Sequence, residues 1–170
     1  MKSVLVLIFF AFIISDGVCQ PTGNDDVTDQ IKKIVAAAET NFSTLKQGSG
    51  QKIDTNLQYP STLEINNTDK HSISISLDGK SATYIIPVSS SLNKEQTNKL
   101  YRTWNRNIAA ALGSAFEKNC IPIHLGAIAQ GEQCDYISIK QVNISVTIAN
   151  VYSADTSTSS LDVYVRNEPE

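Results

Sequence analysis

The sequence lacks the residue patterns that mark the common enzyme and cofactor sites. It contains no G-x-S-x-G turn, no H-E-x-x-H helix, no phosphate-binding glycine loop and no calcium-loop signature. Only two histidines are present, so a histidine acid–base pair would need His71 and His124 to meet through folding. We therefore expect no cofactor, no metal and no catalytic residues of a familiar type.

Basic residues are also few. The chain has 14 Lys and Arg residues against 17 Asp and Glu, a net charge of −3, and no long basic stretch. Recognition of nucleic acid needs concentrated positive charge. We therefore expect a protein or a small ligand as the partner, and no nucleic acid.

The apolar run at the N-terminus predicts export. Lys2 precedes an uninterrupted apolar stretch over residues 4–14, after which polar residues return. This stretch is too short to span a bilayer. Residues 1–19 are therefore predicted to be a signal peptide, which makes the protein secreted or periplasmic, with no transmembrane segment after cleavage.

Two cleavage positions suit a signal peptidase, after Gly17 and after Cys19, and we favour the second. In the alternative, Cys19 is the lipid-anchored first residue of a bacterial lipoprotein, although Asp16 and Val18 stand where that signal needs other residue types. Removing nineteen residues from 170 leaves 151, enough for one domain. We expect a flexible leader over residues 20–25, one domain over 26–166 and a tail over 167–170.

Cysteine is scarce as well, because cleavage after Cys19 leaves only Cys120 and Cys134. An even number of cysteines in an exported protein predicts a disulfide bond. A zinc site is the alternative, but His124 is the one further ligand nearby. Between the two cysteines the chain is apolar and irregular, with Pro122 in its middle, and we expect it to pack on the core beneath the disulfide.

Two amphipathic helices are the clearest elements. Over residues 93–116 apolar side chains recur every fourth position and include Trp104, with Asn93 and Gln96 placed as a capping box. A second apolar stripe runs from Val27 to Leu45, and Gly48 is expected to end that helix. The stretch 47–57 has no period and reads as a loop.

Strands follow each helix. Ile73 and Ile75 alternate with serines, Asp78-Gly79 supplies a tight turn, and Ala82 and Tyr84 then resume the same face. This hairpin predicts that Ile75 pairs with Ala82 and Ile73 with Tyr84, and that Pro87 ends the pairing. Further strands are predicted over residues 59–66, 136–140, 142–151 and 161–165.

This order of elements predicts an α+β fold in which two long amphipathic helices pack on an antiparallel sheet. The two parts of the chain are alike in outline, each with a helix, an irregular stretch and about three strands. Two similar α-β-β-β halves are therefore an open alternative to one unrepeated arrangement, and the halves share no residue-level identity. Cystatin-like proteins offer an analogy of fold alone, without a shared motif.

Four further features bear on a site. His71 is expected in a solvated turn, and His124 as packed structure. Tyr101 and Trp104 could stack on a sugar, but their helical spacing favours the core. Glu117, Glu132 and Asp135 flank the cysteine loop and could gather around a cation, although their spacing matches no known cation loop.

Three N-x-S/T sequences begin at Asn41, Asn66 and Asn143. Asn66 precedes a turn and is the best placed glycosylation acceptor of the three.

Together these patterns favour an exported, non-catalytic binding or structural domain with an unknown ligand. The alternative is a small hydrolase that uses His124 with a nearby carboxylate.

Removal of the leader can be tested directly. N-terminal sequencing of the exported protein should begin at Val18 or Gln20, because cleavage follows Gly17 or Cys19. An exported protein that still begins with Met1 would refute the signal peptide.

Overall fold

The computed structural model describes residues 24–125, 129–153 and 158–169. It is a mixed α/β structure with two helices and one eight-stranded antiparallel sheet. The predicted signal peptide, Cys19 and most of the expected leader lie outside the described residues.

Each helix is followed by four strands. The first group is α1 (Asn24–Ala38), β1 (Gln51–Ile53), β2 (Asn56–Pro60), β3 (Ser72–Ser76) and β4 (Ala82–Leu92). The second is α2 (Lys94–Leu112), a short 3-10 turn η1 (Gly113–Ala115), β5 (Phe116–Leu125), β6 (Ala129–Ser138), β7 (Ile144–Ser153) and β8 (Thr158–Asn167).

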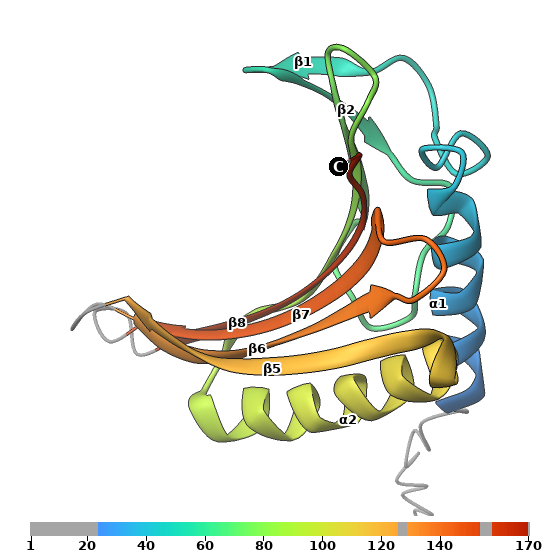
Figure 1. Cartoon of the computed structure of the whole chain (residues 1–170). Helices are drawn as coiled ribbons and strands as arrows, with labels where there is room; N and C mark the ends of the chain where they lie inside the picture. The colour runs from blue at the N-terminus through green and yellow to red at the C-terminus, as the bar shows by residue number, and fades with distance from the viewer. Residues whose placement is uncertain (1–23, 126–128, 154–157, 170) are drawn as a thin grey trace, which may run out of the picture.

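The sheet joins the two groups of strands at its centre. Its order is β1-β2-β3-β4-β8-β7-β6-β5, so the last strand of each group, β4 and β8, lie side by side. Every neighbouring pair is antiparallel. The sheet is strongly curved, and both helices lie on its convex side (Figure 1).

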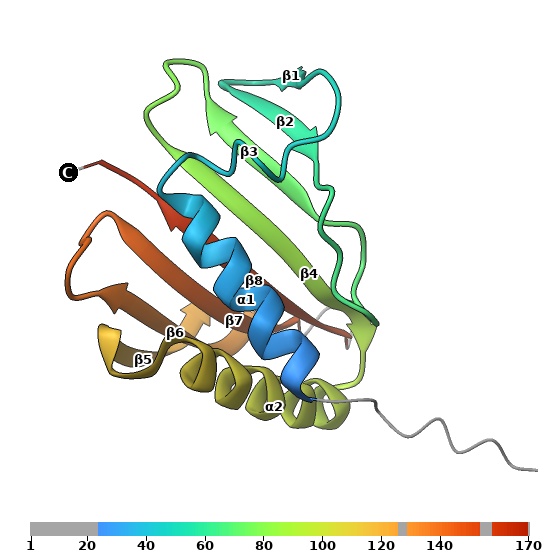
Figure 2. The same ribbon diagram turned by 90° about the vertical axis from the view of Figure 1, so that its right-hand side faces the viewer.

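The core lies between the helices and the convex face. In Figure 2, α1 crosses over the middle of the sheet, and α2 lies beside α1 and packs against β7 and β8. Alternate residues of the central strands point into this layer, as the two-residue period of a strand requires. The fully buried members with the largest side chains are Tyr84, Phe42, Ile31, Ile34, Ile73, Ile86, Ile108, Ile144, Ile148, Leu161, Val146 and Val163.

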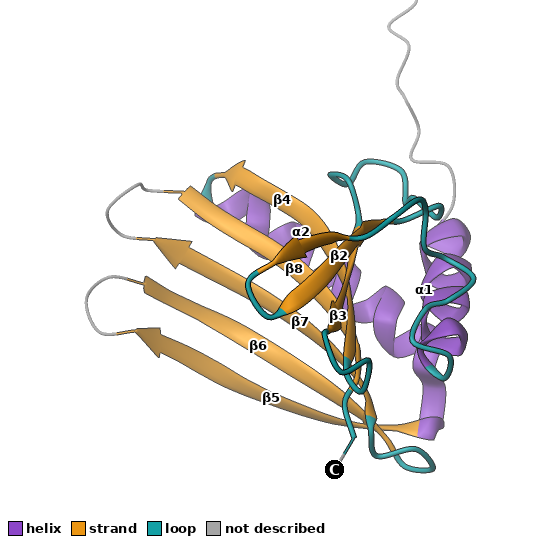
Figure 3. Cartoon of the chain, turned by 90° about the horizontal axis from the view of Figure 1, so that it is seen from above, coloured by secondary structure: helices purple, strands orange, loops and turns teal. Residues whose placement is uncertain are grey.

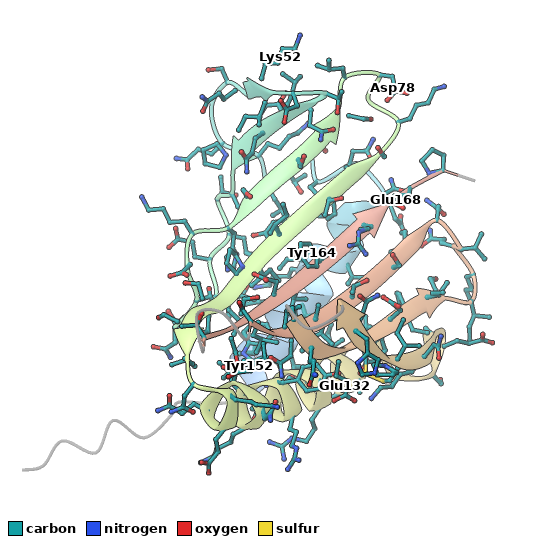
Figure 4. The ribbon with its side chains drawn as sticks, turned by 90° about the vertical axis from the view of Figure 1, so that its left-hand side faces the viewer. Lys52, Asp78, Glu132, Tyr152, Tyr164 and Glu168 are labelled. Carbon is teal, nitrogen blue, oxygen red and sulfur yellow. A yellow bond between two sulfur atoms is a disulfide. The ribbon has the colours of Figure 1, made fainter. Side chains whose placement is uncertain are left out.

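The concave face carries no helix among the described residues, as the view from above shows (Figure 3). Tyr164 lies near its centre (Figure 4), between Ile85 of β4 and Thr147 of β7 in the strand register. Ile85 and Tyr164 share this face with polar side chains such as Thr147, so the face is mixed and not wholly polar.

The first helix is shorter than its apolar stripe predicts, since α1 ends at Ala38 and not at Leu45. The backbone turns into the left-handed region at Asn41 and Phe42, with φ of 51° and 57°. The Phe42 amide donates to the Ala37 carbonyl over 2.8 Å and closes the end of the helix. Phe42 still reaches the core from this turn, which is why the periodicity outlasts the helix.

The second helix begins as predicted. Asn93 accepts a hydrogen bond from the Gln96 amide, and the Gln96 side chain accepts one from the Asn93 amide, which completes the capping box. The helix ends at Leu112, before the predicted Phe116, because Gly113 has a positive φ of 57°. Phe116 instead begins β5.

The hairpin of β3 and β4 has the predicted register, with Ile73 opposite Tyr84 and Ile75 opposite Ala82. The pairing within this hairpin ends before Pro87, as predicted, because its last pair is Ser72 with Ile85. Strand β4 nevertheless continues to Leu92, and Pro87 pairs with Asp162 of β8. The Pro87 carbonyl accepts from the Asp69 amide, so its nitrogen also faces that side, where β3 has already ended. Proline therefore costs this sheet no ladder hydrogen bond.

Two other strand predictions need correction. The expected loop 47–57 contains β1 and the start of β2, which form a small hairpin. The expected strand 59–66 ends at Pro60, and residues 61–71 form a loop that returns to β3. A three-residue edge strand such as β1 is too short to show a hydrophobic period.

The segment between the cysteines is a strand, and not a cap on the core. Its described residues belong to the edge strand β5 (residues 121–125) and to β6 (residues 129–133), which pair with each other, and Ile121 is 45% exposed. Cys120 and Cys134 are directly opposite each other at disulfide distance, with Sγ atoms 1.96 Å apart and Cα atoms 4.0 Å apart. Such a short Cα separation is typical of a pair that exchanges no backbone hydrogen bonds. The backbone polar groups of Cys120 and, two residues on, Pro122 therefore face the free edge.

Within the described ranges, the structure has no helix that is both long and apolar enough to cross a membrane.

Replacing the core tryptophan should destabilise the fold. Trp104 is 5% exposed and packs with the core cluster, so Trp104→Ala should lower the free energy of unfolding by about 3–5 kcal/mol in urea titrations. Arg102→Ala, at an exposed position of the same helix, is the control and should change it by less than about 0.5 kcal/mol. Equal effects of the two substitutions would contradict the placement of Trp104 in the core.

Candidate functional site

A pocket of about 240 Å³ opens where α2 begins and β5, β6 and β7 approach the turns at their ends. Tyr152 and Glu132 mark this end of the sheet in Figure 4, next to α2. The residues around the pocket come from four elements: Lys94, Asn98, His124, Gln130, Gly131, Glu132, Asn150 and Tyr152.

Strand register brings these residues together. His124 pairs with Gln130 across the β5–β6 hairpin. On the next ladder, Gln130 pairs with Tyr152 and Glu132 with Asn150. Even-numbered residues of β6 and β7 share the helix side of the sheet, so they face the first turns of α2.

Asn150 is the best evidence for a ligand site. Its side chain is 7% exposed, and its Nδ2 donates to Asn98 Oδ1 over 2.8 Å. Its own Oδ1 is buried without a hydrogen-bond partner in the described structure. A buried unsatisfied acceptor costs about 1–3 kcal/mol, and Asn150 is among the residues that line the pocket.

Gly131 lets β6 approach β7 closely beside Asn150. A Cβ atom on Gly131 would lie 1.9 Å from the Asn150 backbone oxygen, which no side chain can tolerate. A glycine inside a strand often marks such an approach. Besides His124 and Glu132, this glycine is a signal in the sequence that points toward the pocket.

The pocket carries charges of both signs. Lys94 Nζ lies 5.0 Å from the centroid of the Tyr152 ring, a cation–π contact that holds the lysine over the mouth. Glu132 and His124 are both exposed. Positive and negative groups at the rim, together with the amides of the lining, suit a polar ligand.

The three carboxylates that could have gathered around a cation, Glu117, Glu132 and Asp135, are separated. Glu132 lines the same pocket as His124, although no hydrogen bond joins the two among the described residues. Asp135 belongs to the opposite face of β6, where it accepts hydrogen bonds from Gln133 and from Thr147. Glu117 lies on the edge strand, opposite Ile137. The three carboxylates therefore form no cluster, and no group of three metal-binding side chains occurs in the described part of the chain.

His71 is buried, which corrects its predicted place in a solvated turn. It is 4% exposed and lies between the loop and β4. Its Nδ1 is 3.0 Å from the Tyr84 hydroxyl, and its Nε2 is 2.8 Å from Thr68 Oγ1. Ser61 Oγ lies 2.6 Å from the same tyrosine hydroxyl, so this network ties the loop 61–71 to the sheet.

Other predicted residues have structural places. Tyr101 and Trp104 are in the core, which leaves neither for a surface sugar. The Tyr101 hydroxyl is 3.1 Å from Cys134 Sγ, and Asn105 Nδ2 donates to that sulfur over 3.3 Å. Burial raises the pKa of Tyr101 well above its usual range, so it stays a neutral hydroxyl.

The three N-x-S/T asparagines differ in environment. Asn66 is exposed in a turn. Asn41 donates to the Gly79 carbonyl, and the Asn143 side chain donates to Asn167, which itself donates to Asn41. Glycosylation of Asn66 stays a prediction.

Comparison with family models, with curated proteins and with solved structures finds no match for this chain.

The buried histidine predicts a pH dependence of stability. Loss of solvation lowers the pKa of His71, although the Leu63 carbonyl and the Glu64 carboxylate act in the opposite direction. The folded-state pKa thus lies below the unfolded value of about 6.5. The contribution of His71 is therefore fully present above that value and is lost as the pH falls through the folded pKa.

Urea titrations at several pH values test this expectation. Between about pH 7 and pH 5, the wild-type protein should lose stability more steeply than His71→Gln. His124→Gln removes the exposed histidine and should follow the wild-type curve. If His71→Gln loses stability with falling pH as steeply as the wild type does, the titration of His71 does not control stability between these pH values.

Proposed function

We propose that this protein is an exported, non-catalytic binding domain that takes a small polyhydroxylated ligand, such as one sugar unit, into the pocket between α2 and the β5–β7 end of the sheet. The unpartnered, buried Oδ1 of Asn150 is the observation that carries the proposal. A binding site can retain a buried polar group that has no hydrogen-bond partner, at a cost in stability, because the bound ligand supplies that partner.

The chemistry of the lining supports a sugar-like ligand. Asn98, Gln130 and Asn150 supply amides, which both donate and accept hydrogen bonds, and Tyr152 supplies an aromatic ring at the rim. The volume of about 240 Å³ is below the range of about 300–1,000 Å³ that drug-sized ligands occupy. A single ring that carries several hydroxyls matches both the size and the donor set.

Export is the second part of the proposal. It rests on the apolar run over residues 4–14 and on two cysteines at disulfide distance, an arrangement typical of oxidising compartments. We place the protein in the secreted or periplasmic space on this basis.

We also propose that the fold consists of two related units, each a helix followed by four antiparallel strands. The order of elements and the side-by-side placement of β4 and β8 support this. The predicted three strands per half become four because β1 and the paired β5 and β6 had no clear period.

A hydrolase is the second candidate, because His124 and Glu132 line the same pocket. Their positions on diagonal sites of the β5–β6 hairpin would let a histidine base and a carboxylate act on one bound molecule. Release of p-nitrophenol from ester and glycoside substrates, lost in His124→Ala, would favour this candidate. Equal rates in the two proteins would remove it.

The binding function is tested with a panel of monosaccharides that includes glucose, galactose and N-acetylglucosamine. At least one should bind the wild-type protein in calorimetry, and Asn150→Ala should weaken that binding by at least about tenfold, since about 1.4 kcal/mol corresponds to a tenfold change. Asn119→Ala, at an exposed position of β5, is the matched control and should bind as the wild type does.

Tyr152→Ala provides a second variant in case Asn150→Ala folds poorly, and it should also weaken binding. Absence of binding across the panel, or binding that survives both pocket substitutions, would overturn the proposal.

A further inference from the structure

A row of cations extends from the pocket along the outer side of α2. Lys99, Arg102 and Arg106 are exposed, and they follow one another at three- and four-residue spacing, which places them on one side of the helix. With a rise of about 1.5 Å per residue, neighbouring charges in this row are separated by about 4–6 Å along the axis. Lys94, in the first turn of the same helix, lines the pocket.

These cations form no ion pair with any of the described residues. The ion pairs of the described structure are Lys32–Asp29 and Arg166–Glu168, and neither involves α2. Glu95 is the one carboxylate in the helix, at its first turn. The row therefore has a surplus of positive charge in a chain whose net charge is −3, which is an uneven distribution that favours an anionic partner.

The cation row and the pocket form one continuous surface. A second shallow hollow on α2 is lined by Lys94, Glu95, Asn98, Lys99, Arg102 and Thr103. It shares Lys94 and Asn98 with the pocket that contains Asn150. A molecule seated in the pocket would thus reach Lys99 and Arg102 without leaving the protein surface.

We propose that the ligand is a segment of an acidic polysaccharide, in which one sugar ring occupies the pocket and the carboxylates of the following residues lie along Lys99, Arg102 and Arg106. This inference rests on the proposed sugar-binding function. The pocket supplies the hydrogen bonds that recognise hydroxyls, and the row supplies the charge that selects an acidic chain over a neutral one. Guanidinium groups suit this role because they bind carboxylates with two parallel hydrogen bonds.

The test compares a tetramer of galacturonic acid with the neutral tetramer maltotetraose, each measured by calorimetry at about 20 mM and about 300 mM NaCl, which changes the screening of charge. The acidic tetramer should bind at least about tenfold more tightly at low salt, a difference of about 1.4 kcal/mol. Most of this preference should disappear at high salt.

Two variants separate this inference from the binding function. Arg102→Gln combined with Arg106→Gln should remove the preference for the acidic tetramer and leave maltotetraose binding unchanged. Lys33→Gln combined with Lys140→Gln removes the same charge from exposed positions elsewhere and should keep the preference. Asn150→Ala should weaken binding of both tetramers.

Each result has a defined meaning. Equal binding of the two tetramers by the wild type, or a preference that survives the double arginine substitution, would overturn the acidic-ligand inference while sugar binding stands. If neither tetramer binds the wild-type protein, the acidic-ligand inference fails, and the monosaccharide panel decides whether the sugar-binding proposal stands.

Discussion

The antiparallel ladder between β4 and β8 is the interaction on which the rest of the structure depends. It pairs residues from Ala82 with Asn167 to Leu92 with Ser159 and joins the four strands that follow each helix into one sheet. Because the two strands are central, both helices find one continuous apolar face to cover. The position of α2 over β7 and β8, and with it the pocket at its first turn, follows from this ladder.

Local signals predict the elements they control. The Asp78-Gly79 turn determines the register of β3 and β4 within a few residues, and the capping box of Asn93 and Gln96 lies within one helical turn. Both were confirmed because the physics that determines them needs no distant partner. The same is true of Trp104, whose stripe defines the buried side of its own helix.

Features that depend on distant pairing could not be predicted. Strand β5 carries Ile121 on one side and Cys120 and Pro122 on the other, so its sequence shows no simple alternation of apolar and polar residues. Its pairing with β6 is what makes it a strand. The hydrogen bond between Asn150 and Asn98 spans 52 residues of sequence, and no sequence pattern near either asparagine predicts it. His71 was misplaced for the same reason, because its burial depends on Tyr84 across the loop.

Pro122 limits the addition of further strands at the β5 edge of the sheet. The edge of β5 offers a row of unused carbonyl and amide groups, on which a strand of another molecule could add and extend the ladder. At Pro122 this row has no amide hydrogen to offer, and the ring stands where an added backbone would have to lie. At the opposite edge, β1 is three residues long, too short to template a stable addition. Both edges of the curved sheet therefore resist the addition of further strands, which limits the stacking of its long strands into fibrils.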